Sequence, residues 1–172
     1  MAVMATKQLT VSAAARNAWL RLDDAALMGQ SREERYRASG PGGQRRNKVE
    51  TAVRLRHGPT GVSVHAEEGR MLEVNRRRAV RRLRQRIAME VRAPFGGELP
   101  PEFTAQRGGS GTLAVNTRNP SYPLILATAL DALALADGSY AKAAASLGLT
   151  TSQLLKFLKA DRELWRAVSE ME

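Results

Sequence analysis

The sequence predicts an α+β fold, in which a β-hairpin and a basic helix form one small domain and a helical segment follows it. Apolar and polar residues alternate over 51–66, as in a hairpin, and apolar residues recur at helical spacing over 75–92. The runs "APFGGELPP" and "QRGGSG" indicate a Gly/Pro-rich linker. We therefore expect an N-terminal helical segment (1–30), a compact domain (31–92), the linker (93–119) and a C-terminal helical domain (120–172).

Composition is typical of a globular protein. The 172 residues are 43% apolar and 26% charged, which supports a modest core and argues against disorder. No apolar run approaches the roughly 20 residues that span a bilayer. The absence of cysteine excludes disulfides and thiolate metal sites. We expect a cytoplasmic protein that uses neither a metal nor another cofactor.

Residues 12–29 are expected to form one amphipathic helix or two short ones, with Trp19, Leu22 and Leu27 on one side. The segment before Asp23 contains no acid and is rich in alanine, so an organelle transit peptide is an alternative. We favour the ordinary helix.

The hairpin and the basic helix follow in that order. The strand expected at 51–57 places Arg54 and Arg56 on the face opposite to its apolar residues. A turn, "GPTG", and a second alternating run, "VSVHA", complete the hairpin. Asn75 is expected to cap the N-terminus of the helix at 75–92. The apolar stripe of this helix consists of Val80, Leu83, Ile87 and Val91.

Positive charge is concentrated in one block of the chain. Residues 32–92 hold 17 Lys or Arg and 7 Asp or Glu, so the net charge of +10 lies there. The helix at 75–92 carries eight arginines, and Glu90 is its only acid. Because neighbouring arginines on a helix repel one another, we favour a nucleic-acid partner over an ordinary solvated face.

The segment "ASGPGGQRRNK" (38–48) joins a Gly/Pro turn to a glutamine and uncompensated cations. A phosphate-binding P-loop needs another spacing and a hydroxyl. A dinucleotide fingerprint needs a third glycine, since only Gly40 and Gly42 fit. No acid–histidine pair is suggested for Ser39 as a hydrolytic nucleophile. The remaining interpretation is a Gly-Gly-Gln loop that acts on an ester.

The run "SGPGGQRRNKVETAVRLRHGPTGVSV", followed by Arg70 and Asn75, resembles the catalytic domain of peptide chain release factors. The resemblance covers about residues 35–92 and is greatest to the short, codon-independent members of that superfamily. It implies a protein that enters the ribosomal peptidyl transferase centre and hydrolyses the ester between the nascent peptide and tRNA.

The resemblance also implies catalytic roles for Gly42, Gly43 and Gln44. The glycines permit a close backbone approach, and the N–H of Gln44 faces the developing oxyanion or the water. The glutamine side chain lines the pocket and admits water. Ribosomal RNA and tRNA supply the other groups around the reacting ester, so no catalytic base from the protein is needed.

Large-subunit ribosomal RNA and peptidyl-tRNA are the implied partners, and no membrane is involved. The candidate RNA-binding residues are the polar and cationic residues of the loop, the hairpin and the basic helix: Arg45, Arg46, Asn47, Lys48, Arg54, Arg56, Arg70, Arg76, Arg77, Arg81 and Arg84. Arg46 departs from the valine usual in release factors, and Met71-Leu72 departs from a common Ser-Gln pair. We interpret Arg46 as a mark of a subfamily, and Met71-Leu72 as the loss of a polar contact that does not imply an inactive enzyme.

About 35 residues precede the motif, too few for a domain that reads stop codons. We therefore expect codon-independent peptide release, as in the rescue of stalled ribosomes. Small rescue proteins end in a basic tail, but residues 118–172 hold six Lys or Arg and six Asp or Glu. A ribosome- or RNA-binding module without hydrolysis is the alternative, for which Met71-Leu72 gives mild support.

The segment "YAKAAASLGLTTSQLLKFLKAD" (140–161) resembles a helix-turn-helix, with Thr150 or Thr151 as the cap of its second helix. Docking of nucleic acid through Gln153, Lys156 and Lys159 is one interpretation, and it would make the chain a nucleic-acid-binding regulator. On charge grounds we favour a helical bundle that packs or binds a protein.

Overall fold

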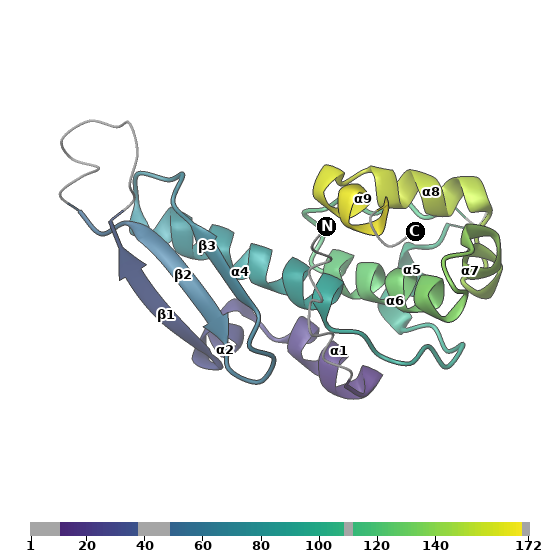
Figure 1. Ribbon diagram of the computed structural model, residues 1–172, viewed down its shortest axis with the longest axis horizontal. Coiled ribbons are helices and arrows are strands. Elements are labelled where there is room, and N and C mark those ends of the chain that lie inside the picture. Colours follow the sequence, from purple (N-terminus) through teal and green to yellow (C-terminus); the bar gives the residue numbers. More distant parts are fainter. Residues whose placement is uncertain (1–10, 38–48, 109–111, 170–172) are drawn as a thin grey trace, which may run out of the picture. The chain divides into compact units, whose positions relative to one another are not determined.

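The computed structural model describes residues 11–37, 49–108 and 112–169, and it confirms the α+β class (Figure 1). The chain divides into two compact units. Residues 18–90 form the first, which we call the sheet unit, and residues 1–17 with 91–172 form the second, which we call the helical unit. Helix α1 (Ala13–Arg21) contains the boundary between them. Within the described residues, no helix is both long and apolar enough to cross a membrane.

The sheet unit contains α2 (Asp24–Gly29), β1 (Ser31–Tyr36), β2 (Ala52–His57), β3 (Ser63–Ala66) and α4 (Leu72–Glu90). The strands form an antiparallel sheet in the order β1-β2-β3. The segment expected at 12–29 is thus two helices, with Asp23 capping α2 through its side chain.

The predicted hairpin is confirmed by β2 and β3, but β1 is an additional strand. Its sequence, SREERY, contains no apolar residue other than the terminal tyrosine, so no hydrophobic alternation marks it. It pairs with β2 over its whole length, from Ser31 opposite His57 to Tyr36 opposite Ala52. Backbone pairing to a buried neighbour therefore defines this strand, not its own side chains.

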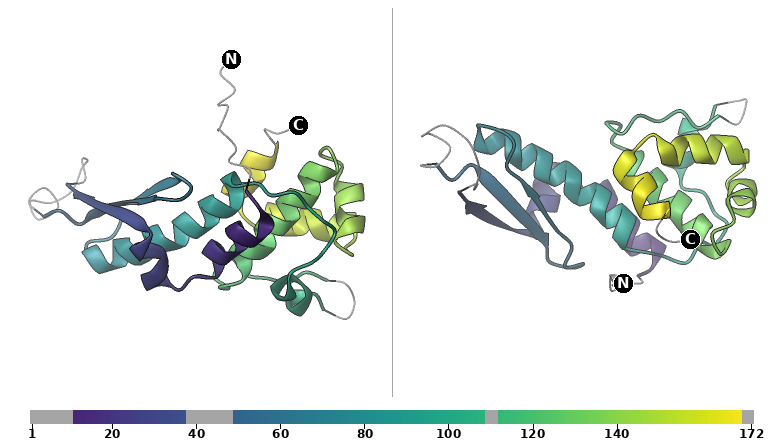
Figure 2. Two further views of the ribbon diagram at one scale, coloured as in Figure 1. Left: turned by 90° about the horizontal axis from the view of Figure 1, so that it is seen from below. Right: turned by 45° about the horizontal axis from the view of Figure 1, so that its top comes forward.

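Helix α4 lies along one face of the sheet (Figure 2). Its buried side chains include Val80, Leu83 and Ile87, which are 0–2% exposed, as the periodicity predicted. They pack in the same unit as the buried Leu55 of β2 and Val64 of β3. This apolar layer is the core of the sheet unit.

Asn75 does not cap α4, so that prediction is wrong. The helix begins at Leu72, and the side chain of Asn75 is fully buried inside its first turn. A cap residue lies at the exposed start of a helix, whereas this amide bonds to backbone groups outside the helix, as described below.

The helical unit contains α5 (Pro101–Gln106), α6 (Tyr122–Leu135), α7 (Tyr140–Ser146), α8 (Thr151–Lys159) and α9 (Arg162–Ser169). Helix α6 is buried along most of its length and forms the centre of this unit. Between α7 and α8, Gly148 has a φ of 65°, which glycine adopts readily. Thr150 caps α8 in a reciprocal capping box with Gln153, which resolves the choice between the two threonines.

The Gly/Pro-rich segment 93–119 holds structure that the sequence did not indicate. It contains α5, whose Phe103 is fully buried, and an isolated antiparallel bridge between Arg107 and Leu113. Pro101 stands at the start of α5, where proline fits a helix without loss of a hydrogen bond.

A buried charge cluster lies in the helical unit. Asp131 on α6 forms ion pairs with Arg16 and with Arg92, and all three side chains are nearly inaccessible to solvent. The second oxygen of the carboxylate also accepts a bond from the backbone N–H of Ala93, at 3.2 Å. Burial lowers the pKa of Arg92 to about 10, with Asp131 opposing the shift and Arg16 adding to it.

Candidate functional site

The candidate catalytic residues Gly42, Gly43 and Gln44 lie outside the described residues, as do the candidate RNA-binding residues Arg45, Arg46, Asn47 and Lys48. The structure instead describes the two strand ends beside this segment and the groups bonded to them, which we call the frame. The segment connects β1 to β2, and the last residue of β1, Tyr36, is paired with the first residue of β2, Ala52. The connection therefore leaves and re-enters one end of the sheet through adjacent strands.

Asn75 fixes the entry to β2. Its Nδ2 donates to the carbonyl oxygen of Thr51 at 2.7 Å and to that of Gly69 at 3.0 Å. Its Oδ1 accepts from the N–H of Gly69 at 2.8 Å. A Cβ on Gly69 would lie 2.6 Å from Oδ1, so this position requires glycine. One buried amide thus ties Thr51, which leads into β2, to the turn before α4.

Tyr36 is held at the other strand end. Its hydroxyl donates to Oε2 of Glu67 at 3.1 Å. Partial burial and this carboxylate raise the pKa of Tyr36. The two strand ends that flank the candidate catalytic motif are therefore both linked to the 66–70 region, Tyr36 directly through Glu67 and Thr51 through Asn75.

Several arginines of α4 make intramolecular bonds. Arg76 makes a bidentate pair with Glu33 of β1, with both N–O distances 2.9 Å. The hydrogen bond from Arg76 lowers the pKa of Glu33, against a smaller opposing effect of burial, and raises that of Arg76. Arg84 bonds Asp24 and, at 2.6 Å, the carbonyl oxygen of Leu22. These two candidate RNA-binding residues also hold β1 and α2 against the helix.

Arg82 was not among the sequence-derived candidates, yet it has a clear structural role. It bonds the carbonyl oxygen of His65 and the carboxylate of Glu68. The hydrogen bond from Arg82 lowers the pKa of Glu68 to about 2. The partner lies 14 residues away, so no local pattern in the helix indicates the pair.

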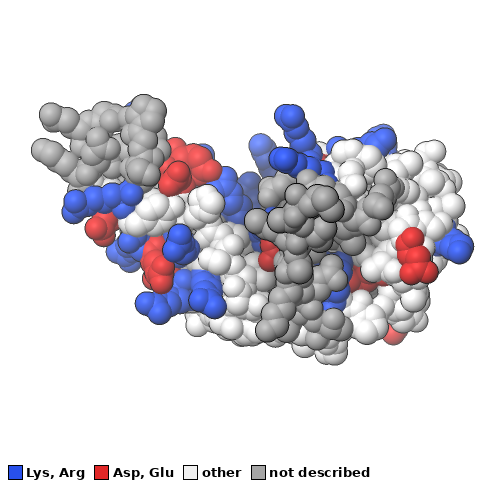
Figure 3. Space-filling model, in the orientation of Figure 1, with Lys and Arg blue, Asp and Glu red and all other residues white. Residues whose placement is uncertain are grey.

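The other candidate arginines of the sheet unit are exposed: Arg54, Arg56, Arg70, Arg77 and Arg81. Among them, Arg54 approaches Glu34 at 3.8 Å and Arg77 approaches Glu73 at 3.9 Å, distances that give only weak pairs in water. On the part of the surface formed by this unit, cationic groups lie among acidic and uncharged residues (Figure 3). These arginines are accessible to a polyanion.

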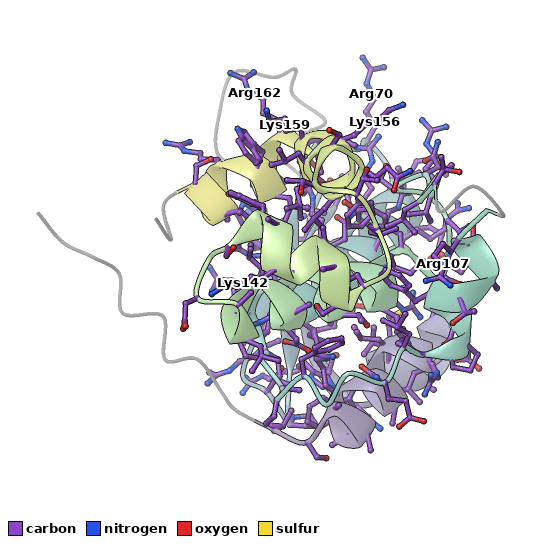
Figure 4. All side chains as sticks on the ribbon, turned by 90° about the vertical axis from the view of Figure 1, so that its right-hand side faces the viewer. Arg70, Arg107, Lys142, Lys156, Lys159 and Arg162 are labelled. Atoms are coloured by element: carbon purple, nitrogen blue, oxygen red, sulfur yellow. The ribbon has the colours of Figure 1, made fainter. Side chains whose placement is uncertain are left out.

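In the helical unit, the side chain of Gln153 is engaged by its capping box, because its Oε1 accepts from the N–H of Thr150 at 2.9 Å. Lys156 and Lys159 are exposed on α8, and they lie on the same edge as Arg162 of α9 (Figure 4). The ammonium of Lys159 lies 4.8 Å from the ring centre of Trp165. Docking of nucleic acid through this edge stays the less favoured interpretation, and the side chain of Gln153 caps a helix.

Comparison with known proteins finds similarity over most of the sheet unit. Residues 28–99 match the family model described as the RF-1 domain. Peptide chain release factor 2 of Acidovorax sp. (strain JS42) is 52% identical over 56 residues, which are 33% of this chain and 15% of that protein. Peptide chain release factor 1 of Acidiphilium cryptum (strain JF-5) is 38% identical over 88 residues, 51% of this chain and 25% of that protein.

A third relative extends the aligned region. Peptide chain release factor 1 of Granulibacter bethesdensis (strain ATCC BAA-1260 / CGDNIH1) is 36% identical over 95 residues, 55% of this chain and 27% of that protein. The chain thus spans 15% to 27% of the length of these three relatives. The resemblance to the peptide chain release factor superfamily is confirmed for this part of the chain.

Proposed function

We propose that the RF-1 domain at residues 28–99 makes this chain a peptidyl-tRNA ester hydrolase that acts on the ribosome without requiring a stop codon. The observation that carries the proposal is the Gly-Gly-Gln tripeptide at 42–44, which falls within the matched region. Similarity to named release factors supports peptide release in general. Codon independence comes from the resemblance to the short members of the superfamily and is the finer part of the proposal.

In this proposal the backbone of Gly42 and Gly43 admits the loop tip to a tight RNA cavity, and the N–H of Gln44 stabilises the developing oxyanion. Such stabilisation requires a donor held in place before the reaction begins. The frame supports this requirement, because Asn75 and the Tyr36–Glu67 bond fix both strand ends beside the loop. The protein supplies position, and ribosomal RNA and tRNA supply the remaining groups.

Cations next to the loop contact RNA in this proposal. Arg45, Arg46 and Lys48, with Asn47, belong to the loop segment. The exposed Arg70, before α4, and Arg77 and Arg81, on α4, extend the positive charge. Each phosphate contact releases condensed counterions, so binding weakens as salt rises. Arg76 and Arg84 contribute to binding through the fold, because their guanidinium groups bond Glu33 and Asp24.

The test is peptide release from ribosomes that carry peptidyl-tRNA and an empty, a sense-codon or a stop-codon A site. We expect comparable release from all three, and we expect Gln44→Ala and Gly43→Ala to slow release by at least about 100-fold while ribosome binding survives. Gln106→Ala, in the helical unit, is the matched control. Unchanged release in both loop variants would disprove the catalytic assignment, and release only at stop codons would disprove codon independence.

The same assay separates the alternative function. A protein that binds large subunits but frees no peptide from any of the three complexes is a binding module, not a hydrolase. Met71 is 65% exposed and Leu72 is half-buried, so only the first residue of the pair that departs from Ser-Gln faces outward, and the bonds of Asn75 beside it are intact.

A further inference from the structure

The sheet has one covered and one open face. Helix α4 packs on the face that carries the buried Val53, Leu55 and Val64. Alternation along the strands sends the neighbouring side chains to the opposite face. The exposed residues of this open face are Arg32 and Glu34 from β1, Arg54 and Arg56 from β2, and Ser63 and His65 from β3.

Like charges stand directly opposite one another on this open face. Arg32 is the cross-strand partner of Arg56, and its side chain is 80% exposed. A like-charge pair in this position destabilises an antiparallel sheet. Glu34 is the acid nearest to the group, with its carboxylate 3.3 Å from Arg32 and 3.8 Å from Arg54. Among the described residues Arg56 has no ion pair, so the open face carries three guanidinium groups and one carboxylate, which pairs with two of them.

The covered face shows the opposite arrangement. There Glu33 of β1 takes both Arg76 of α4 and Arg35 of its own strand, with N–O distances of 2.8–2.9 Å. The arginines on that side are satisfied within the protein. The contrast indicates that the arginines of the open face take their anionic partners from another molecule.

We propose that the open face of the sheet binds the phosphates of structured RNA, with Arg32, Arg54 and Arg56 as the phosphate-binding residues. Arg54 and Arg56 lie on the same face two residues apart, roughly 7 Å along the strand, so they reach successive phosphates of one backbone. Guanidinium groups bind phosphate in a bidentate manner. Among the described residues of this face the one large aromatic side chain is Tyr36, which is half-buried and bonded to Glu67, so the exposed groups are mainly charged and favour a polyanion as the partner.

This inference rests on the proposed function only for the identity of the RNA, which is then ribosomal. It adds Arg32, which no local pattern marks, to the RNA-binding set. It also explains why a strand as polar as β1 is kept at the edge of the sheet, because β1 supplies one half of the cationic pair.

The experiment compares Arg32→Gln, Arg56→Gln and the double variant with Arg35→Gln. Arg35 lies on the same strand as Arg32 and loses the same charge, but it belongs to the covered face, where it pairs with Glu33. Binding to isolated large ribosomal subunits is measured over a range of KCl concentrations, and the stability of the free protein is measured by urea unfolding. A mixed-sequence DNA duplex serves as a second polyanion.

We expect the double variant to bind at least about 10-fold more weakly at low salt and to lower the slope of log affinity against log salt by about 1 to 2. Its urea midpoint stays the same or rises, because the opposed charges are removed. We expect Arg35→Gln to keep the salt slope, and the DNA duplex to bind more weakly than the subunits.

Three results would overturn the inference: an unchanged slope in the double variant, an equal loss with Arg35→Gln, or a fall in stability that accounts for the loss of binding. Equal binding of the DNA duplex would also overturn the preference for RNA. Peptide release is measured separately at saturating protein. If the parent protein never releases peptide but the double variant still loses RNA binding, the hydrolase proposal is disproved and the RNA-binding role of the open face stands.

Discussion

Truncation of Asn75 to alanine should destabilise the sheet unit by about 3 kcal/mol. The side chain makes three hydrogen bonds to backbone groups and is fully buried. Each such bond contributes about 1 kcal/mol net, and the groups of Gly69 and Thr51 that lose their partner add a desolvation cost. With a urea m value of about 2 kcal/mol/M, the unfolding midpoint falls by about 1.5 M.

Tryptophan fluorescence isolates this unit. Trp19 lies in the sheet unit and Trp165 in the helical unit, so a Trp165→Phe background leaves Trp19 as the reporter. Asn116→Ala is the matched control, because Oδ1 of Asn116 is exposed and accepts a single bond, from the N–H of Arg118 at 2.8 Å. Because Asn116 lies in the helical unit, this variant should leave the unfolding midpoint reported by Trp19 unchanged. A midpoint for Asn75→Ala within about 0.3 M of the parent would refute the argument.

Two further perturbations test other parts of the fold. Asp131→Asn leaves two buried guanidinium groups without their carboxylate, so we expect the helical unit to lose about 3–5 kcal/mol of unfolding free energy, measured by thermal unfolding. A loss below about 1 kcal/mol would contradict a stabilising role of the charge cluster. Burial lowers the pKa of His57 from 6.5, so the folded state favours the neutral ring. The free energy of unfolding of the sheet unit should therefore be greatest above pH 6.5 and should decrease as the pH falls from there toward the folded-state pKa. Urea midpoints at pH 7.5 and 5.5 measure this effect. His57→Gln should reduce it, whereas exposed His65→Gln should retain it; equal pH dependence in parent and His57→Gln would count against the assignment.

The hairpin and α4 were predictable because their apolar periodicities are strong and local. Val53 and Leu55 alternate with arginines, and Val80, Leu83 and Ile87 recur at helical spacing. The strand β1 lacked any such signal, because its stability comes from pairing with β2. The predicted start of α4 was wrong for a related reason. Asn75 is a residue type that often caps helices, but its hydrogen-bond partners lie 6 and 24 residues away.

The candidate site, too, was only partly predictable from the sequence. The tripeptide at 42–44 and the excess of arginine are visible in the sequence, and comparison confirms the family resemblance that they suggest. The sequence does not reveal which arginines are already bonded. Arg76 and Glu33 are 43 residues apart, and Arg16 and Asp131 are 115 residues apart. Only the tertiary structure distinguishes these from the exposed Arg56.

The discontinuity of the helical unit has a consequence for how the chain is made. Residues 11–17 emerge early in synthesis, but Asp131, the buried partner of Arg16, emerges more than a hundred residues later. Residues 18–90 are contiguous and are available together once residue 90 has left the exit tunnel. Because units generally fold as they emerge, the sheet unit should complete its folding while the start of α1 still awaits its partner. The start of α1 is thus synthesised before the sheet unit, yet it is among the last parts of the chain to acquire its native contacts.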